Sequence, residues 1–253
     1  MNTKLAVGVA LGLLGSLSAA ADVTGPIPTP FSGDGGVFVA VWSDTKSTVQ
    51  YLGSTVSGFL TDDVAGAPDG MLMFDVDLGV FGGNLAGVNY AVVGADYRES
   101  LYVGNRTLFT SPGTDFVPQS GVAGSGGAID LFVNFVNGQC GATVPCPSTS
   151  PDDEWNAISL GESLAGSLGG VNAAIGSALG FFLASGVDDF GNSEDPAKLE
   201  RYGSAFGNTF VTLAQNGKLT IVTPQVPLPA AAGLLLSGLI GLGTVARRRA
   251  AAV

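Results

Sequence analysis

Carboxylates are the side chains of this sequence best suited to chemistry. Asp75 and Asp77 stand two residues apart in MLMFDVDLGVF, where apolar residues alternate with them. On a strand, two residues at that spacing point to the same face of the sheet. Such a pair can bind calcium, or act as acid and base if a third group raises one pKa. The spacing is equally typical of the solvent-exposed face of an antiparallel sheet, and both interpretations stay open.

A second group of acidic residues lies in the segment VDDFGNSEDP. Its oxygen-bearing residues surround a glycine and are Asp188, Asp189, Asn192, Glu194 and Asp195. Oxygen-rich loops that contain a glycine suit calcium, although the spacing here is not that of an EF-hand. We expect either a weak calcium site or an exposed acidic loop that binds no metal, and no other cofactor.

Histidine is absent from the chain. Its absence excludes Ser-His-Asp and Cys-His catalysis and the metal sites that need imidazole. Carboxylate-based hydrolysis of a polysaccharide stays open, and it requires two acids about 5–10 Å apart in one cleft. The combination that meets this requirement is Asp75 or Asp77 brought close in the fold to an acid that is distant in the sequence, such as Asp188. We predict no catalytic residue, with a secreted glycoside-acting enzyme as the alternative.

Aromatic side chains offer another kind of site. Several of them form a carbohydrate-binding platform if they face outward together. The candidates are Trp42, Tyr51, Tyr90, Tyr97 and Tyr102. Aromatic residues in β-proteins also serve as core residues or as cross-strand pairs, so their exposure decides between the two roles.

The charge of the chain is concentrated in its middle. All 21 acidic residues lie between Asp22 and Glu200. Of the 10 basic residues, four lie near the two ends, so six remain in the middle. Nucleic-acid phosphates need many Lys and Arg partners, so we expect no nucleic-acid partner. The same acidic excess repels anionic lipid headgroups.

The first 21 residues have the pattern of a secretory signal peptide. Lys4 supplies a positive start and residues 5–17 form an apolar run. Ala19 and Ala21 supply the small residues of a cleavage site. A buried N-terminal helix is the alternative, and it accounts for neither the charge nor the small residues. We therefore expect export by the Sec machinery and cleavage after Ala21.

The two cysteines, Cys140 and Cys146, lie in the segment CGATVPC. Export places them in an oxidising compartment, where a disulfide persists. Gly141 and Pro145 between them suit a small closed loop. Redox and metal sites more often use Cys-x-x-Cys or further ligands, so we predict a structural disulfide.

The C-terminal stretch has three parts, which are the motif VPLPA at 226–230, an uncharged run at 230–246 and a cluster of arginines. As a helix, the uncharged run spans roughly 26 Å, enough to cross a thin bilayer core. Four glycines weaken it as a permanent anchor, so we expect a temporary transmembrane helix. By the positive-inside rule the arginines stay in the cytoplasm, and residues 22–225 lie outside.

This three-part pattern resembles the PEP-CTERM sorting signal of Gram-negative bacteria, in its VPLPA variant. The matching residues are Val226, Pro227, Leu228, Pro229 and Ala230 in the motif and Arg247, Arg248 and Arg249 as the stop-transfer signal. The resemblance implies recognition by an exosortase, a multi-spanning membrane enzyme similar to a transpeptidase. It further implies a cut near the Pro-x-Pro motif, followed by release or by transfer to the cell surface.

Two residues depart from the commoner form of that signal. Leu228 replaces a glutamate, a change that the VPLPA variant accepts, and Gly233 stands where an aromatic residue often follows. Two other interpretations of the tail stay open. One is a GPI-type signal, which has a polar spacer that this tail lacks, and the other is a membrane anchor that is never cut.

These observations favour a non-catalytic cell-surface or exopolysaccharide-matrix protein that is exported, transiently inserted in the inner membrane and processed by an exosortase. Its expected partners are the exosortase, the Sec machinery and exopolysaccharide. One alternative is a structural subunit of a surface fibre assembled by strand addition, which an unpaired groove, or GVFVAVW at 36–42 left exposed as an edge, would favour. The secreted carboxylate enzyme is the other alternative.

The exported middle has the pattern of a β-protein. A lead-in rich in Pro and Gly covers residues 22–35. Hairpins are predicted at 36–55, 89–109 and 210–222, the last with a type I′ turn at Asn216-Gly217. Further strands are predicted at 71–81, 128–138 and 179–186.

No long helix is expected in this region, because seven glycines interrupt residues 158–186. We predict an all-β fold, a single antiparallel β-sandwich or jelly-roll-like domain over residues 36–224. An N-terminal signal helix and the C-terminal transmembrane helix are expected to flank it.

Overall fold

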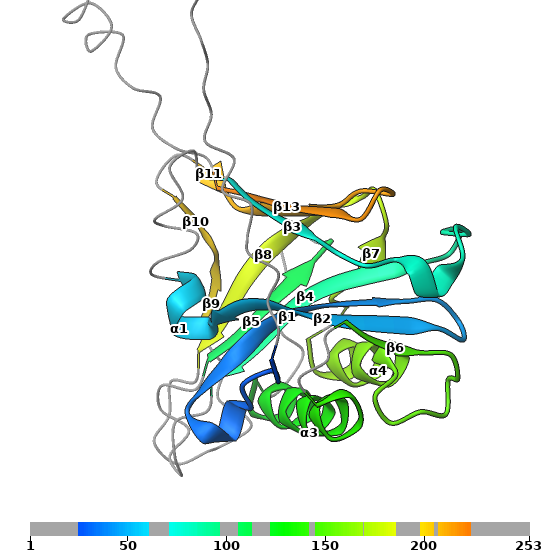
Figure 1. The fold of residues 1–253 in the computed structure, drawn as a ribbon. Helices are drawn as coiled ribbons and strands as arrows, with labels where there is room; N and C mark the ends of the chain where they lie inside the picture. The colour runs from blue at the N-terminus through cyan, green and yellow to red at the C-terminus, as the bar shows by residue number, and fades with distance from the viewer. Residues whose placement is uncertain are drawn as a thin grey trace, which may run out of the picture.

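The described part of the chain forms one strongly curled antiparallel sheet with two helices against its outer side (Figure 1). The computed structural model describes residues 25–60, 71–96, 106–112, 122–141, 145–168, 170–185, 198–204 and 207–223. Neighbouring strands follow the order β3-β13-β12-β8-β5-β4-β1-β2-β6, while β7 pairs with β4 and β9 pairs with β8. Two further short strands, β10 and β11, pair with each other.

The strands are β1 (Asp34–Trp42), β2 (Ser47–Thr55), β3 (Met71–Asp75), β4 (Asn89–Asp96), β5 (Arg106–Ser111), β6 (Cys146–Ser148), β7 (Ala173–Ala174), β8 (Ala178–Ser185), β9 (Lys198–Arg201), β10 (Gly203–Ser204), β11 (Gly207–Asn208), β12 (Phe210–Leu213) and β13 (Lys218–Val222). The α-helices are α1 (Val56–Gly58), α3 (Val122–Cys140) and α4 (Ala157–Leu168). Short 3-10 helices are η1 (Pro30–Ser32) and η3 (Gly79–Phe81).

The hairpin predicted at residues 36–55 is confirmed as β1 and β2. β1 also pairs with β4, so both of its edges are hydrogen-bonded. β4 and β5 pair as the second predicted hairpin requires, and its expected turn near Arg98-Glu99 lies outside the described residues. Because β1 lies inside the sheet, GVFVAVW is not a free edge, and this one of the two features that would favour assembly by strand addition is not found.

The third predicted hairpin is confirmed as β12 and β13, but its turn differs from the predicted one. The N–H of Gly217 donates to the carbonyl oxygen of Ala214 at 3.0 Å, and the N–H of Ala214 donates to that of Lys218 at 2.9 Å. Gly217 has a φ of 82° and follows the turn instead of lying at its centre. The connection is therefore a three-residue loop closed by a glycine bulge, not a two-residue type I′ turn.

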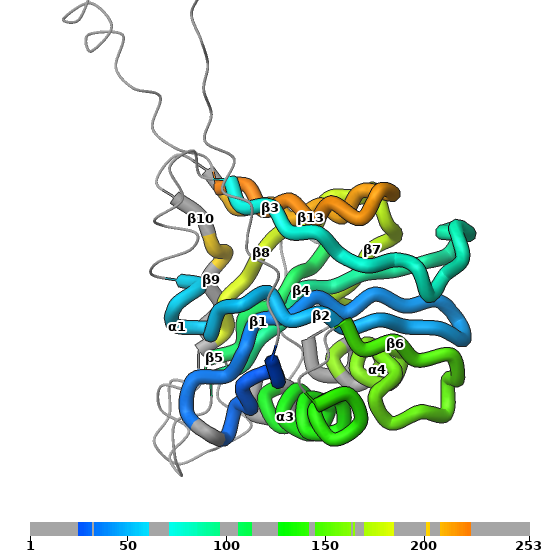
Figure 2. Tube along the Cα trace, in the orientation of Figure 1, coloured from blue at the N-terminus to red at the C-terminus, as the bar shows by residue number. Residues whose placement is uncertain are grey.

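The sheet curls until its two ends come close together (Figure 2). Gln50 of β2 bridges them, since its Nε2 donates to the Asp75 carbonyl oxygen at 2.6 Å and its Oε1 accepts from the Asp77 N–H at 3.2 Å. The all-β prediction is thus confirmed in its coarse form. The described long strands lie in one curled sheet, whereas a sandwich consists of two packed sheets.

One hydrophobic core fills the inside of the curl. Its side chains alternate along the strands with outward-facing ones, as a period of two requires. Both ends of the sheet contribute to it, with Val37, Val39, Val41, Phe74, Phe181, Leu219 and Ile221 among its members. This inner core fixes the curl, because flattening the sheet would expose these side chains to water.

Tyr90 is a polar residue inside this core. Its side chain is fully buried, and its hydroxyl lies 2.6 Å from the carbonyl oxygen of Ser177 and 3.0 Å from that of Val211. Burial raises the pKa of Tyr90 from its usual 10.0 to about 12, because the phenolate loses its hydration. The hydroxyl therefore stays protonated in the folded protein well above the pH at which a free tyrosine ionises.

Alkaline pH should destabilise the fold through Tyr90. The unfolded chain ionises this residue near pH 10 and the folded chain near pH 12, so the stabilisation is complete below pH 10 and is lost as pH rises toward 12. The expected loss in the free energy of unfolding is on the order of 2 kcal/mol. Urea denaturation at pH 9 and near pH 12 measures it. The variant Tyr90→Phe should show a flatter alkaline slope, and an unchanged slope contradicts the assignment.

The prediction that no long helix interrupts the strands is wrong. The segment 128–138, predicted as a strand, belongs to helix α3. Its buried residues Ile129, Phe132, Val133 and Val136 are spaced three or four apart, which is the helical period. The same segment also reads as an alternation of apolar and polar residues, and a short apolar run fits either period.

Helix α4 also contradicts the prediction of no long helix, since it contains two of the glycines that were expected to prevent one. Its buried residues Ala157, Leu160, Gly161 and Leu164 again follow the helical period. Gly161 lies against the indole of Trp42, and a Cβ built there would stand 2.8 Å from the ring. Contact with the sheet therefore requires this glycine, and packing outweighs its low helix propensity.

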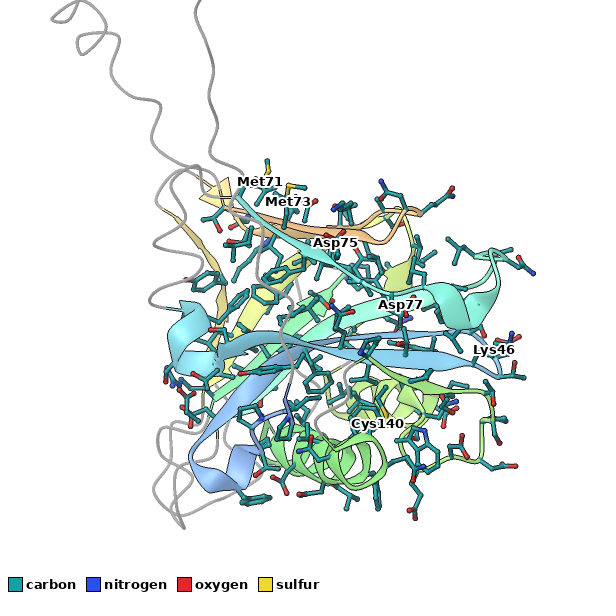
Figure 3. The ribbon with its side chains drawn as sticks, in the orientation of Figure 1. Lys46, Met71, Met73, Asp75, Asp77 and Cys140 are labelled. Carbon is teal, nitrogen blue, oxygen red and sulfur yellow. A yellow bond between two sulfur atoms is a disulfide. The ribbon has the colours of Figure 1, made fainter. Side chains whose placement is uncertain are left out.

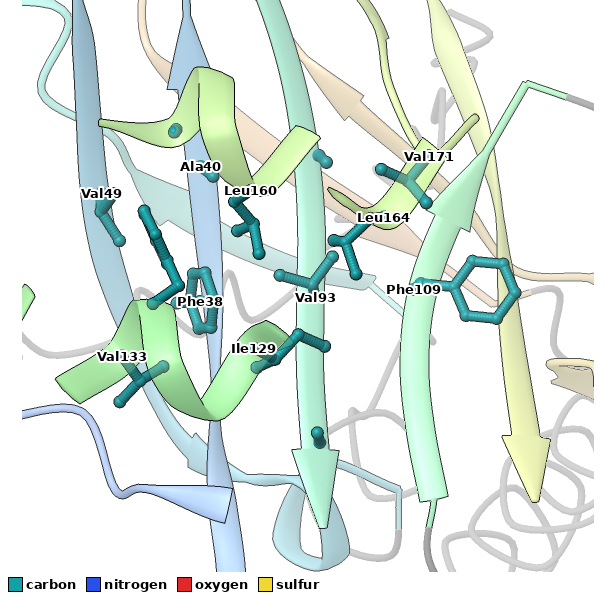
Figure 4. Packing of buried hydrophobic residues seen from close by; sticks show 14 of the residues in the cluster. Phe38, Ala40, Val49, Val93, Phe109, Ile129, Val133, Leu160, Leu164 and Val171 are labelled. Carbon is teal, nitrogen blue, oxygen red and sulfur yellow. The ribbon is translucent and has the colours of Figure 1, made fainter. Parts of the chain in front are cut away.

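The two helices cover the outer face of β1, β2, β4 and β5 and form a second hydrophobic core with it (Figure 4). From the sheet come outward-facing residues such as Phe38, Ala40 and Val93. The ring of Phe38 stacks on that of Phe132 with centroids 6.0 Å apart. The result is a layer of helices on a curled sheet, with one core on each side of β1 and β4.

Candidate functional site

One pocket on the described surface is a groove between α3 and α4. It has a volume of about 270 Å³ and is lined mainly by apolar side chains. The lining residues are Ala128, Leu131, Phe132, Phe135, Glu154, Ser159 and Leu160. Leu131 is 57% exposed, which is unusual for a large apolar residue in a helix that packs on a sheet.

Helix α3 is held in place by the N-terminal lead-in. The side-chain amide of Asn137 accepts from the N–H of Ile27 at 2.9 Å and donates to its carbonyl oxygen at 2.8 Å. Asp130 Oδ1 accepts from the N–H of Phe31 at 3.1 Å. A strand-like pair of hydrogen bonds thus joins the helix to a segment that precedes it by about a hundred residues.

Helix α4 begins at a fixed point above the sheet. Asn156 precedes it, and its Oδ1 accepts from the N–H of Ile158 at 2.9 Å, as a helix cap does. Its Nδ2 donates to the Ser148 hydroxyl at 3.0 Å. The N–H of Ala157 donates to the Ser47 hydroxyl at 3.1 Å, which ties the start of the helix to β2. The groove is therefore bounded by two helices whose positions are set independently.

The predicted disulfide between Cys140 and Cys146 is confirmed, with Cα atoms 5.7 Å apart. It joins the last residue of α3 to the first residue of β6, which pairs with β2 at the margin of the sheet. Figure 3 labels Cys140 at this junction. The disulfide therefore fixes the end of the helix that forms one wall of the groove.

Removing the disulfide should cost about 2 kcal/mol in the free energy of unfolding, because it closes a short loop. The suitable variant replaces both Cys140 and Cys146 by alanine, so that no single thiol is left. Urea denaturation with and without a reductant measures the effect. Reduced wild type and the double variant should unfold at similar urea concentrations, and a reductant should not affect the variant. Equal stability of oxidised and reduced wild type contradicts this prediction.

The chemistry of the groove is that of an apolar slot beside a negative charge. Its volume is below that of a typical pocket for a drug-sized ligand and suits one or two apolar side chains or a short acyl segment. Glu154 is exposed beside it, and residues 122–168 contain five acidic residues and no Lys or Arg. A positively charged neighbour of an apolar group therefore suits the groove better than a negatively charged one.

The structure places the predicted carboxylate pair elsewhere. Asp75 and Asp77 are both exposed at the end of β3, far along the chain from the groove residues (Figure 3). Asp75 forms an ion pair with Lys218, and Asp77 Oδ1 accepts from the N–H of Gly79 at 2.8 Å. This arrangement matches the solvent-exposed face of a sheet, which was one of the two expectations.

The aromatic residues that the structure describes do not form the predicted carbohydrate-binding platform. Tyr90 is fully buried in the inner core, and Trp42 is buried beneath α4. Tyr51 is half-buried against the outer core. These three residues serve as core residues, which was the alternative role. Tyr97 and Tyr102 lie outside the described residues.

The remaining predicted site residues also lie outside the described residues. They are Ala19 and Ala21 of the cleavage site, the acidic loop at 188–195, the motif at 226–230 and Arg247, Arg248 and Arg249. In the ranges that the structure does describe, no group of three Asp, Glu or Cys residues stands close enough together to hold a metal ion. Nor does any helix within those ranges have the length and apolar character needed to span a membrane.

No family model matches this chain, and no curated protein or solved structure matches it either.

The groove was not among the predicted site residues. A sequence signal for the groove was nevertheless present, because Leu131 and Phe135 lie four residues apart, beside the buried residues of α3. That spacing becomes visible only when the segment is assigned to a helix. Assigning it to a strand placed these residues on the same face as buried ones and concealed the apolar pair that lines the groove.

Proposed function

We propose that this chain is an exported, non-catalytic surface or matrix protein that an exosortase processes at its C-terminal signal. The observation that carries the proposal is the order of VPLPA, uncharged run and arginines in residues 226–250. In this account residues 1–21 are a signal helix that directs export. Residues 230–246 are a transmembrane helix that holds the protein in the inner membrane until it is cut.

Two features of the fold support this proposal. The disulfide between Cys140 and Cys146 suits an oxidising compartment outside the cytoplasm. The last strand that the structure describes, β13, ends at Val222, and the motif begins at Val226. The described sheet therefore uses no residue of the motif, and a cut near Pro229 removes no strand from it.

The proposed route assigns a role to each end of the chain. The Sec machinery exports the chain, and Arg247–Arg249 stop the transfer on the cytoplasmic side. The exosortase then binds the motif at 226–230 and cuts near it. The folded domain reaches the cell surface or the exopolysaccharide matrix of a Gram-negative bacterium, where its acidic surface keeps it soluble.

Mass spectrometry of the protein from a host with an exosortase tests the proposal. The mature chain should start near Asp22 and lack everything beyond about Pro229. Changing Pro227 and Pro229 to alanine together should leave the tail intact and the protein in the inner membrane. A matched control, Pro151→Ala, changes an exposed proline in the described domain and should be processed normally. An intact wild-type tail in the inner membrane overturns the proposal.

A further inference from the structure

An apolar row crosses the outer face of the sheet where the helices leave it uncovered. Phe210 of β12 pairs with Val222 of β13, and Val222 pairs with Met71 of β3. Cross-strand partners point to the same face, so these three side chains are neighbours. Phe210 is 43% exposed and Met71 39% exposed. Figure 3 shows Met71 and Met73 pointing away from the body of the molecule.

This row lies at the place where the chain leaves the sheet. Val222 is the last residue of β13 and the centre of the row. At about 3.5 Å per residue, the chain from Thr223 to Ala230 spans at most roughly 25 Å. When residues 230–246 are inserted in a bilayer, the row is therefore held within that distance of the membrane surface.

The segment of residues 223–230, which we call the tether, also limits how the domain can turn relative to the membrane. A domain of this length is roughly 40 Å across. Helices α3 and α4 lie on the side opposite β3 and β13 (Figure 1). If the helices lay against the bilayer, the end of β13 would stand farther from it than the tether reaches. Of these two sides, the short tether allows only the one that carries the row to rest on the membrane.

The charges favour the same orientation. Residues 122–168, which include both helices, contain five acids and no base, so anionic headgroups repel that side. Residues 198–223 contain three of the six bases of the middle of the chain and a single acid. The guanidinium of Arg201 lies 5.4 Å from the ring centroid of Phe210, at the edge of the row. Asp75 and Asp77 in and after β3 add two acids to this side, so its described residues are close to neutral while the side with the helices is acidic.

We infer that the row formed by Met71, Val222 and Phe210 rests on the surface of the membrane while the C-terminal segment is inserted. Its side chains enter the headgroup boundary, and Arg201 beside them faces anionic lipid. This inference rests on the proposed function, because it requires the tail to be inserted. Its consequence is that the domain presents α3 and α4 away from the membrane until the tail is cut.

Quenching by brominated lipid tests this orientation in the full-length protein. The protein is reconstituted in vesicles of phosphatidylethanolamine and phosphatidylglycerol, with and without bromine on the acyl chains. Phe210→Trp places a probe in the row and keeps an aromatic face for Arg201. Leu131→Trp is the matched control, since Leu131 is an exposed apolar residue on α3. Each emission is compared with that of the wild type, which contains Trp42 and Trp155.

The expected result is a loss of emission from the tryptophan at position 210 and none from that at 131. Met71→Trp, on β3, should behave like Phe210→Trp. It is a second probe of the row, so a folding defect in one of the two variants leaves the other to test the inference. Equal quenching at 210 and 131, or no quenching at 210 and 71 while the protein resists carbonate extraction, overturns the inference and leaves the sorting function intact. Release of the wild type by carbonate overturns both, because the tail is then not inserted.

Discussion

Replacing Arg106 by methionine is expected to lower the free energy of unfolding by about 3–5 kcal/mol. Asp96 at the end of β4 is fully buried, and the Arg106 Nε donates to its Oδ2 at 3.1 Å. The same guanidinium donates to the Ser57 hydroxyl at 2.6 Å, which links β5 to helix α1. Without the guanidinium, the buried carboxylate loses its ion pair, and less of the free energy of its lost hydration is offset. Urea denaturation at neutral pH measures the loss.

The chain supplies a matched control for this experiment. Lys218 and Asp75 also form an ion pair, but both side chains are largely exposed. Lys218→Met should therefore cost less than about 1 kcal/mol. The double variant Arg106→Met with Asp96→Asn should recover part of the loss, because the charge left behind is removed. Similar losses for Arg106→Met and Lys218→Met contradict the claim that burial makes the Arg106 pair important.

The strands were predictable because their signals are local. The alternation of apolar and acidic residues at 74–78 indicates which side chains face the inner core, and the continuous apolar run at 37–41 is typical of a strand buried on both faces. Short polar breaks and the Asn216-Gly217 pair indicate where the chain reverses. The exact turn was missed, since glycine with a positive φ serves both a type I′ turn and a bulge that follows a type I turn. Hairpins need only neighbouring residues, so three of them could be predicted from sequence.

The single curled sheet could not be predicted in the same way. Its closure depends on long-range contacts, which are those of the inner core and the hydrogen bonds from the Gln50 side chain to the backbone of Asp75 and Asp77. A glutamine in a strand carries no signal of such a role. Apolar alternation shows that a face is buried, but a curled sheet and a second sheet bury that face equally well. The choice between them is made by long-range pairing.

The helices were missed for another reason. Gly161 is a poor helix former in isolation, yet in the fold it admits the indole of Trp42 at close contact. That partner lies more than a hundred residues earlier in the chain. Propensity is a weak local preference, and the burial of α4 against the sheet outweighs it. Since the groove is made by these helices, the candidate site could not be found without them.

Replacing Phe38 by alanine is expected to cost about 3–5 kcal/mol, the usual range for a buried phenylalanine. Phe38 is fully buried, and its ring stacks on Phe132 of α3 at a centroid distance of 6.0 Å. The cavity left behind lies between a strand paired on both sides and a helix held by Asn137 and a disulfide. Neither wall can move inward easily, so the cavity persists and the cost stays high.

Two comparisons separate this effect from a general intolerance to change. Phe210→Ala removes an exposed ring from the same sheet and should cost about 0.5 kcal/mol or less. Phe38→Leu keeps most of the buried volume and should cost less than about 1.5 kcal/mol. Combining Phe38→Ala with Phe132→Ala should show a coupling of about 0.5–1.5 kcal/mol between the rings. Strictly additive losses would mean that α3 does not pack on β1 through this pair.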